Sequence, residues 1–275
     1  MRSNTRLWRC GRIALTLSAL LALSACAAFG GAREEALIAP SATIEPTPEA
    51  TPTPTAPPQP EPTPEPTPEP TPEPTPEPTP AGPDLDEREE TAPEGYFEDA
   101  AFIGNSLVNG LSIYDYEDAL HGATFYAENS MTILGAGDYV SRAAGSECRK
   151  IYIGLGMNEL SYDKDALRQC FTDAIAVLRE ADPDRIIYLM AVTPVSRHKS
   201  DTTSDFTKSR VQSFNEMLYS IAEDEGVWYL DSYTALADGD GYLPADVTAD
   251  GVHFTPEYYK RWIELLQTHY YTEDE

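Results

Sequence analysis

The sequence is poor in basic residues and in long apolar runs, and both scarcities restrict what the protein can bind. It has 19 Lys and Arg against 46 Asp and Glu, which gives a net charge of −27 at pH 7. Such a chain repels nucleic-acid phosphates and anionic lipid surfaces, so we expect neither as a partner. The apolar run at residues 13–23 is too short to predict a transmembrane helix.

Cysteine is also scarce, with four in the chain. Cys148 precedes a predicted strand, and Cys170 lies about two turns into the next predicted helix, so the two side chains should lie too far apart for a disulfide. The sequence lacks His-x-His, His-Glu-x-x-His, cysteine pairs at ligand spacing, and Gly-x-Gly-x-x-Gly after a strand. We therefore expect no metal and no other cofactor.

Residues 1–25 have the pattern of a signal peptide, with arginines before the apolar run and small residues after it. The run ends in Leu-Ser-Ala-Cys, which resembles the lipobox of bacterial lipoproteins and implies cleavage before Cys26 and lipidation of its thiol. The alternative is an ordinary secretory signal with an incidental cysteine. Because several acyl chains on one residue anchor a protein stably, we expect a protein held on the outer face of a bacterial cell membrane by its lipid anchor alone.

Residues 26–95 have the composition of a disordered stalk rich in proline, glutamate and threonine. Residues 45–80 repeat Glu-Pro-Thr-Pro, and proline at every second position removes backbone donors and fixes φ, which leaves polyproline II. About 40 such residues at ~3.1 Å each would extend roughly 120 Å. We expect a passive spacer that holds a domain at residues 96–275 away from the membrane, with threonines open to glycosylation.

The pattern of residues 96–275 predicts strands that alternate with amphipathic helices. Apolar runs predict five strands, at residues 101–104, 124–127, 150–156, 185–192 and 227–230. Helical spacing of apolar residues predicts helices at 165–180, at 205–225 and from 256 onward. Strands that are apolar throughout indicate a parallel sheet covered on both faces. We therefore predict an α/β fold, flavodoxin-like, with three α/β/α layers and a five-stranded parallel sheet, and ligands beyond the carboxyl ends of the strands.

Three short motifs follow one another in the order that a serine esterase needs. Gly-Asn-Ser-Leu, with Ser106, follows the first predicted strand; Gly-Met-Asn-Glu, with Asn158, follows the third; Asp-Gly-Val-His, from Asp250 to His253, lies near the C-terminus. Each is weak alone, because the first is an ordinary turn and the last suits a helix cap or half a metal site. Together they supply a nucleophile, a base with an orienting carboxylate, and an amide donor. Surface positions are expected for His121, His198 and His269.

At these residues the chain resembles the SGNH (GDSL-type) hydrolase family, over about residues 97–270. The resemblance implies the SGNH hydrolase fold, with Ser106 as nucleophile, His253 as general base and Asp250 as the carboxylate that orients the base. It also implies an oxyanion hole that uses the Ser106 backbone N–H and the Asn158 side-chain amide.

The chain departs from the family pattern at three places. The third oxyanion donor of the family is a glycine N–H after the second strand, but here no glycine precedes Gly135, so the N–H of Ser130 or Asn129 would have to serve; we assign Ser130. Asn105 and Glu159 each stand where the family usually has aspartate. Neither change removes a catalytic group, but both alter the hydrogen bonds that position one.

The sequence thus predicts a cell-surface serine esterase that removes short acyl groups, such as acetyl, from carbohydrate. The substrate would be a small-molecule or polysaccharide ester, because the longest predicted loops, 195–204 and 236–249, are polar. An O-acyltransferase with the same triad and a non-catalytic surface binding module are the alternatives. We expect a monomer.

Overall fold

The structure is a computed structural model that describes residues 83–272. The predicted signal peptide, Cys26 and most of the predicted stalk lie outside the described residues. Within residues 83–272, no helix combines the length and the apolar character that crossing a bilayer requires.

Five parallel strands form one sheet, as the sequence predicted. They are β1 (Ala100–Gly104), β2 (Thr124–Ala127), β3 (Lys150–Gly154), β4 (Ile186–Met190) and β5 (Trp228–Leu230). Their order is β2-β1-β3-β4-β5, the flavodoxin-like order. The chain passes from β1 to β2 on one side and then to β3 on the other side of β1, so the topological switch point lies between β1 and β3. The predicted strands at 150–156 and 185–192 are longer than β3 and β4, because their last apolar residues are buried in the loops that follow.

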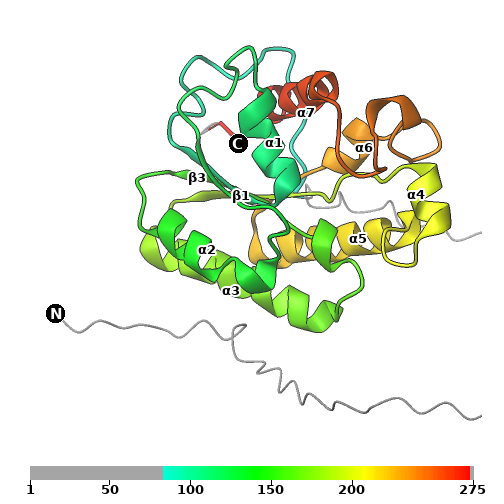
Figure 1. The fold of residues 1–275 in the computed structure, drawn as a ribbon. Helices are drawn as coiled ribbons and strands as arrows, with labels where there is room; N and C mark the ends of the chain where they lie inside the picture. The colour runs from blue at the N-terminus through cyan, green and yellow to red at the C-terminus, as the bar shows by residue number, and fades with distance from the viewer. Residues whose placement is uncertain (1–82, 273–275) are drawn as a thin grey trace, which may run out of the picture. The chain divides into compact units, whose positions relative to one another are not determined.

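Helices cover both faces of this sheet (Figure 1). One layer holds α1 (Ser106–Tyr114), α6 (Ser232–Leu236) and α7 (Pro256–Thr268), and the other holds α2 (Gly137–Ala144), α3 (Lys164–Ala181) and α5 (Lys208–Glu225). The three-layer α/β/α prediction is confirmed. The expected loop at 195–204 is wrong, because it contains α4 (Arg197–Thr202), which begins where the Ser196 side chain accepts from the Lys199 N–H. Its residues are polar and none is buried, so no apolar pattern indicated a helix.

An aromatic row crosses the middle of the sheet and fixes its strands side by side. Paired positions on the five strands carry Phe125, Phe102, Tyr152, Tyr188 and Trp228. Phe102 stacks on Phe125 at 4.9 Å and on Tyr152 at 4.5 Å, and Tyr152 stacks on Tyr188 at 4.2 Å. Each such pair contributes about 0.5–1.5 kcal/mol beyond the area that it buries. The row therefore holds the register of β1 and β3, whose carboxyl ends carry two of the predicted site motifs.

The folded part of the chain begins before residue 96, where the sequence analysis ended the stalk. Leu85 is buried, the Pro83 carbonyl accepts from the Tyr229 N–H at 2.8 Å, and the Arg88 N–H donates to the Thr268 carbonyl at 2.9 Å. The charge and proline content of residues 83–95 predicts a stalk. Long-range backbone hydrogen bonds leave no local sequence pattern, so the sequence gives no sign that these residues join the fold. In the structure Cys148 is a free, buried thiol.

Candidate active site

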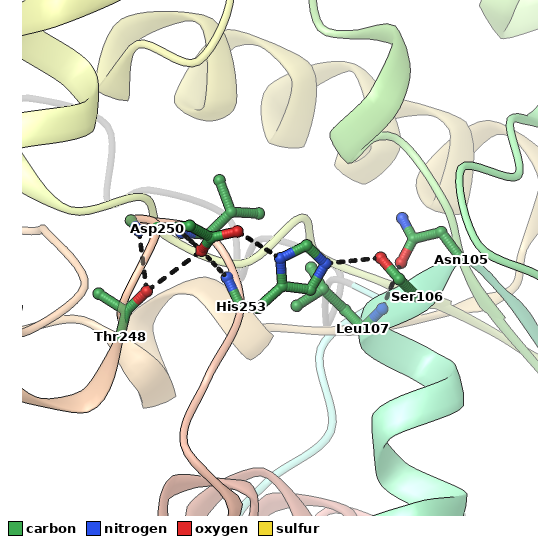
Figure 2. Close-up of polar contacts among 8 residues, drawn as sticks. Asn105, Ser106, Leu107, Thr248, Asp250 and His253 are labelled. Carbon is green, nitrogen blue, oxygen red and sulfur yellow. Dashed lines mark hydrogen bonds and ion pairs between the residues drawn. The ribbon is translucent and has the colours of Figure 1, made fainter.

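Ser106 lies at the carboxyl end of β1, as the first residue of α1. Gly104 permits the tight packing there, because a Cβ on it would overlap Val108 and come within 2.9 Å of the Gly154 carbonyl oxygen. Asn105 is the N-cap, and its side-chain oxygen accepts from the Leu107 N–H at 3.0 Å. Because Asn105 caps the helix, α1 begins at Ser106 (Figure 2). The Ser106 hydroxyl therefore lies at the N-terminus of α1, where the helix dipole favours negative charge.

The side chains of Ser106, His253 and Asp250 form a continuous chain of hydrogen bonds (Figure 2). His253 Nε2 lies 2.9 Å from Ser106 Oγ, and His253 Nδ1 lies 2.7 Å from Asp250 Oδ2. A carboxylate can only accept, so a neutral ring carries its proton on Nδ1, and Nε2 then accepts the serine proton. The sequence placed these three residues on one rim, and the structure brings them into contact.

A tight turn connects Asp250 to His253. Asp250 Oδ1 accepts from the Val252 N–H at 2.9 Å and from the His253 N–H at 2.8 Å. Gly251 has φ +84°, and a Cβ there would lie 2.6 Å from both Lys199 Cβ and Ser196 Oγ, so glycine suits this position for two reasons. The turn therefore packs against the start of α4.

The hydrogen bonds of this turn keep Asp250 ionised. Partial burial by itself would raise the pKa of Asp250, but the bonds from the His253 ring and from two backbone N–H groups outweigh it and hold that pKa well below its usual range. At neutral pH the carboxylate is thus charged and able to stabilise a protonated His253.

Asn158 lies in η3 (Met157–Glu159), directly beyond β3. Its side-chain Nδ2 donates to the Met131 carbonyl at 3.0 Å, in the loop that follows β2. A side-chain amide has two N–H groups, so this bond uses one of them. Gly156 precedes Asn158 with φ +129°, and a Cβ there would lie 2.5 Å from Phe214 and Val192, so the close approach of α5 to this turn requires glycine.

Ser130 takes the backbone conformation that the missing glycine would favour. Its φ is +61°, whereas Asn129 has no positive φ. The loop reaches the nucleophile strand through the Glu128 N–H, which donates to the Gly104 carbonyl at 3.1 Å. The structure thus brings the loop with Ser130 to the end of β1, two residues from Ser106.

The other histidines lie apart from the serine. His121 pairs with Asp118 at 2.7 Å on the surface, His198 is exposed on α4, and the His269 ring contacts the Thr268 hydroxyl. In residues 83–272, no group of three or more His, Cys, Asp or Glu side chains is placed to hold a metal ion.

The rim around the hydrogen-bonded residues is open. The side chains of Asp250 and His253 are 52% and 50% exposed. A cavity of about 610 Å³ lies elsewhere, between residues 84–87 and the C-terminal half of α7, and Ser106, Asp250 and His253 are not among its lining residues.

Two hydrogen bonds at the site could not be predicted from the sequence. Thr248 accepts from the Gly251 N–H at 2.9 Å and so braces the turn before Asp250. Glu159 accepts from the Ile133 N–H at 2.8 Å across 26 positions of sequence. The sequence marked Glu159 as a departure from the family pattern but gave no sign of its partner.

Fold and site together define a class, an α/β protein with the groups of a serine hydrolase at the carboxyl edge of a parallel sheet. The chain belongs to the GDSL-like lipase/acylhydrolase family, whose model matches residues 94–261.

Two solved structures share the fold. A GDSL-like lipase from Bacteroides thetaiotaomicron is 17% identical, with a TM-score of 0.53 over 63% of this chain and 88% of that one. A protein assigned as an acylhydrolase from Bacteroides fragilis is 17% identical, with a TM-score of 0.53 over 65% and 88%. No curated protein sequence matches the chain.

Proposed function

We propose that the protein is a serine esterase that removes short acyl groups from carbohydrate at the cell surface. The observation that supports this proposal most strongly is the pair of hydrogen bonds linking Asp250, His253 and Ser106, at 2.7 and 2.9 Å. Membership of an acylhydrolase family supports ester hydrolysis as the reaction class.

In the proposed reaction, Ser106 Oγ attacks the ester carbonyl carbon while its proton passes to His253 Nε2. A C–O bond forms, and the carbonyl π electrons move to the oxygen. The tetrahedral intermediate then breaks its bond to the alcohol oxygen, which takes the proton from His253. Water attacks the acyl group on Ser106 in the same way and releases the carboxylic acid, so ester and water become alcohol and acid.

Charge stabilisation would come from Asp250 and from the oxyanion donors. The ionised Asp250 stabilises His253 while the ring holds the proton. The Ser106 backbone N–H at the N-terminus of α1, the Asn158 amide and the Ser130 N–H would donate to the oxyanion. Each such donor typically contributes about 10²- to 10³-fold in kcat.

The open rim supports a short-chain, hydroxylated substrate. His253 and Asp250 remain half-exposed, which leaves room for a hydroxylated alcohol group. An acyl chain gains about 0.8 kcal/mol per CH₂ only where an apolar groove buries it. With nitrophenyl esters from acetyl to decanoyl, we expect kcat/KM to be highest for the short chains. A steady rise toward decanoyl would contradict this substrate assignment.

An O-acyltransferase is the second candidate, because a half-exposed His253 admits a sugar hydroxyl as readily as water. Product analysis with and without a sugar acceptor distinguishes the two activities. Acylated sugar in place of free acid would favour the transferase.

The surface location rests on the lipobox at Cys26 and on the proline-rich stalk. The wild type should partition with membranes or detergent when expressed in a bacterium, and Cys26→Ser should not. Equal partitioning of the two, with a mature N-terminus elsewhere, would contradict the lipid anchor.

Ser106→Ala tests the catalytic proposal directly. We expect nitrophenyl acetate hydrolysis to fall by about 10⁴-fold or more, with an unchanged circular dichroism spectrum. Ser112→Ala is the matched control, since Ser112 lies exposed on the same helix and only bonds the Asn109 carbonyl. Full activity in Ser106→Ala would mean that Ser106 is not the nucleophile, whereas a wild type without activity or labelling would favour the non-catalytic binding module.

A further inference from the structure

Glu159 is a buried carboxyl group that the proposed reaction does not use. The residue has 0% of its surface exposed, and its Oε1 accepts from the Ile133 N–H at 2.8 Å. Its Oε2 has no hydrogen-bond partner among the described residues. Burying a carboxyl group with a single hydrogen bond is unfavourable, and an apolar side chain would fill the space at lower cost. A role for the buried Glu159 carboxyl group is therefore expected in the segment that contains its hydrogen-bond donor, Ile133.

Ile133 follows the segment that carries the assigned third oxyanion donor. We call residues 128–132 the oxyanion loop. At its centre Ser130 has φ +61°, a conformation that is unfavourable for a residue with a Cβ. The Glu128, Asn129 and Ser130 side chains are exposed, so packing does not hold this part of the loop. Within the loop, the Met131 N–H donates to the Glu128 carbonyl at 3.1 Å and closes a turn that contains Ser130. Hydrogen bonds to the neighbouring strand ends then fix where this turn lies.

Three hydrogen bonds to neighbouring strand ends hold the oxyanion loop and the residue that follows it. Two of them involve the adjacent residues Asn158 and Glu159. The Glu128 N–H donates to the Gly104 carbonyl at 3.1 Å, which fixes the first end to β1. Asn158 Nδ2 donates to the Met131 carbonyl at 3.0 Å, and Glu159 Oε1 accepts from Ile133, which together fix the second end to η3. The end of β3 thereby sets where the loop lies.

Resting on the proposed function, we propose that Glu159 is a positioning residue that holds the oxyanion loop so that the Ser130 N–H points at the oxyanion. Without the Ile133 bond, the turn that contains Ser130 can shift away from the end of β3, and the Ser130 N–H then no longer points at the oxyanion. The Met131 anchor would loosen with it, so the Asn158 amide would lose its orientation too. Both donors act mainly in the transition state, so the loss falls on kcat and leaves KM nearly unchanged.

The role needs an acceptor oxygen at this point and does not need a charge. Burial raises the pKa of Glu159 to about 7, although the bond from Ile133 lowers it. A carboxyl oxygen accepts from an N–H in either protonation state. A glutamine of the same shape should therefore replace Glu159, whereas alanine should not.

The test compares Glu159→Gln, Glu159→Ala and a control that loses stability far from the site. Arg185→Met is that control, because Arg185 is buried before β4 and donates to the Ala144 and Ser146 carbonyls at 2.9 Å. For each variant, kcat and KM with nitrophenyl acetate, the rate of labelling by a fluorophosphonate and the melting temperature are measured.

We expect Glu159→Ala to lower kcat and the labelling rate by about 10- to 100-fold with KM within about twofold, and Glu159→Gln to stay within about threefold of the wild type. Arg185→Met should melt earlier and keep its kcat. Should Glu159→Ala not fold, Glu159→Asp, one methylene shorter, takes its place with the same expectation.

Two results would overturn the role of Glu159. One is wild-type kcat in Glu159→Ala, and the other is equal loss in Glu159→Gln and Glu159→Ala. A fall in kcat in Arg185→Met that matches Glu159→Ala would reduce the effect to stability and likewise overturn it. Ser106→Ala separates this inference from the proposed function. If labelling disappears in Ser106→Ala and persists at full rate in Glu159→Ala, only the role of Glu159 fails.

Discussion

The chain contains two Asp-x-x-His pairs with the same internal geometry. In Asp118–His121 and in Asp250–His253, histidine Nδ1 lies 2.7 Å from aspartate Oδ2. The first pair lies on the surface before β2, with its side chains 76% and 68% exposed. The second lies on the rim of the sheet, where His253 Nε2 faces Ser106. The Asp-x-x-His spacing is therefore sufficient to form the hydrogen-bonded pair in both places. Only at the second pair does the tertiary structure place a serine hydroxyl against the histidine.

The two pairs also differ in what surrounds the carboxylate. Asp250 accepts hydrogen bonds from two backbone N–H groups and from the His253 ring, and these bonds hold the pKa of Asp250 well below the usual range. Around Asp118 the principal effect is on the histidine, because the hydrogen bond and the charge of Asp118 raise the pKa of His121. The extra bonds fix the position of Asp250, which suits a group that must orient a base.

The largest expected effect comes from removing each histidine in turn. His253→Ala should lower kcat/KM for nitrophenyl acetate by about 10⁴-fold or more, because no base remains within reach of Ser106. His121→Ala should leave kcat/KM within about twofold, since its pair faces no nucleophile. Comparable losses in the two variants would contradict the assignment of His253 as the base.

The next effect is expected at Asn158, the proposed oxyanion donor beyond β3. Asn158→Ala should lower kcat by roughly 10²- to 10³-fold with little change in KM, because the oxyanion forms only in the transition state. Asn215→Ala is the control, since the buried Asn215 amide also donates to a backbone carbonyl, that of Val192, at 2.9 Å. A change confined to KM in Asn158→Ala would assign Asn158 to substrate binding instead.

A smaller effect is expected on stability, and it contrasts buried Glu159 with exposed Glu216. Because the folded-state pKa of Glu159 is raised to about 7, ionisation destabilises the fold as pH rises from about 4.5 to 7 and changes nothing further above that. Glu159→Gln removes this penalty, which is at most about 3 kcal/mol. The melting temperature of Glu159→Gln, relative to that of the wild type, should therefore rise between pH 5 and pH 8.

Glu216→Gln is the control for this pH effect, because Glu216 is exposed on α5. Its melting temperature should keep a nearly constant difference from the wild type between pH 6 and pH 8. A Glu159→Gln difference that stays flat over the same range would show that Glu159 is not protonated in the folded protein near neutral pH.

Features with local or periodic signals were predictable from sequence. Apolar runs gave the five strands and their parallel arrangement, and the Asp250–His253 spacing fits within one turn. The position of Ser106 followed from its place after the first apolar run. These features depend on contacts between residues near in sequence, or on a repeat that recurs along each element.

Features that depend on distant partners were not predictable. Glu159 contacts Ile133 from another strand end, and residues 83–95 join the fold through backbone bonds to β5 and the end of α7. The short helix α4 has no apolar stripe because none of its residues is buried. The positive φ of Ser130 is unfavourable for its residue type, so propensity did not predict it.

The most direct test of the account is to locate the fluorophosphonate adduct by peptide mass spectrometry. In the wild type, one adduct should form, on Ser106. It should form at the same rate in His121→Ala and far more slowly in His253→Ala, because only His253 takes the serine proton. An adduct on another residue, or none on folded protein, would contradict Ser106 as the nucleophile.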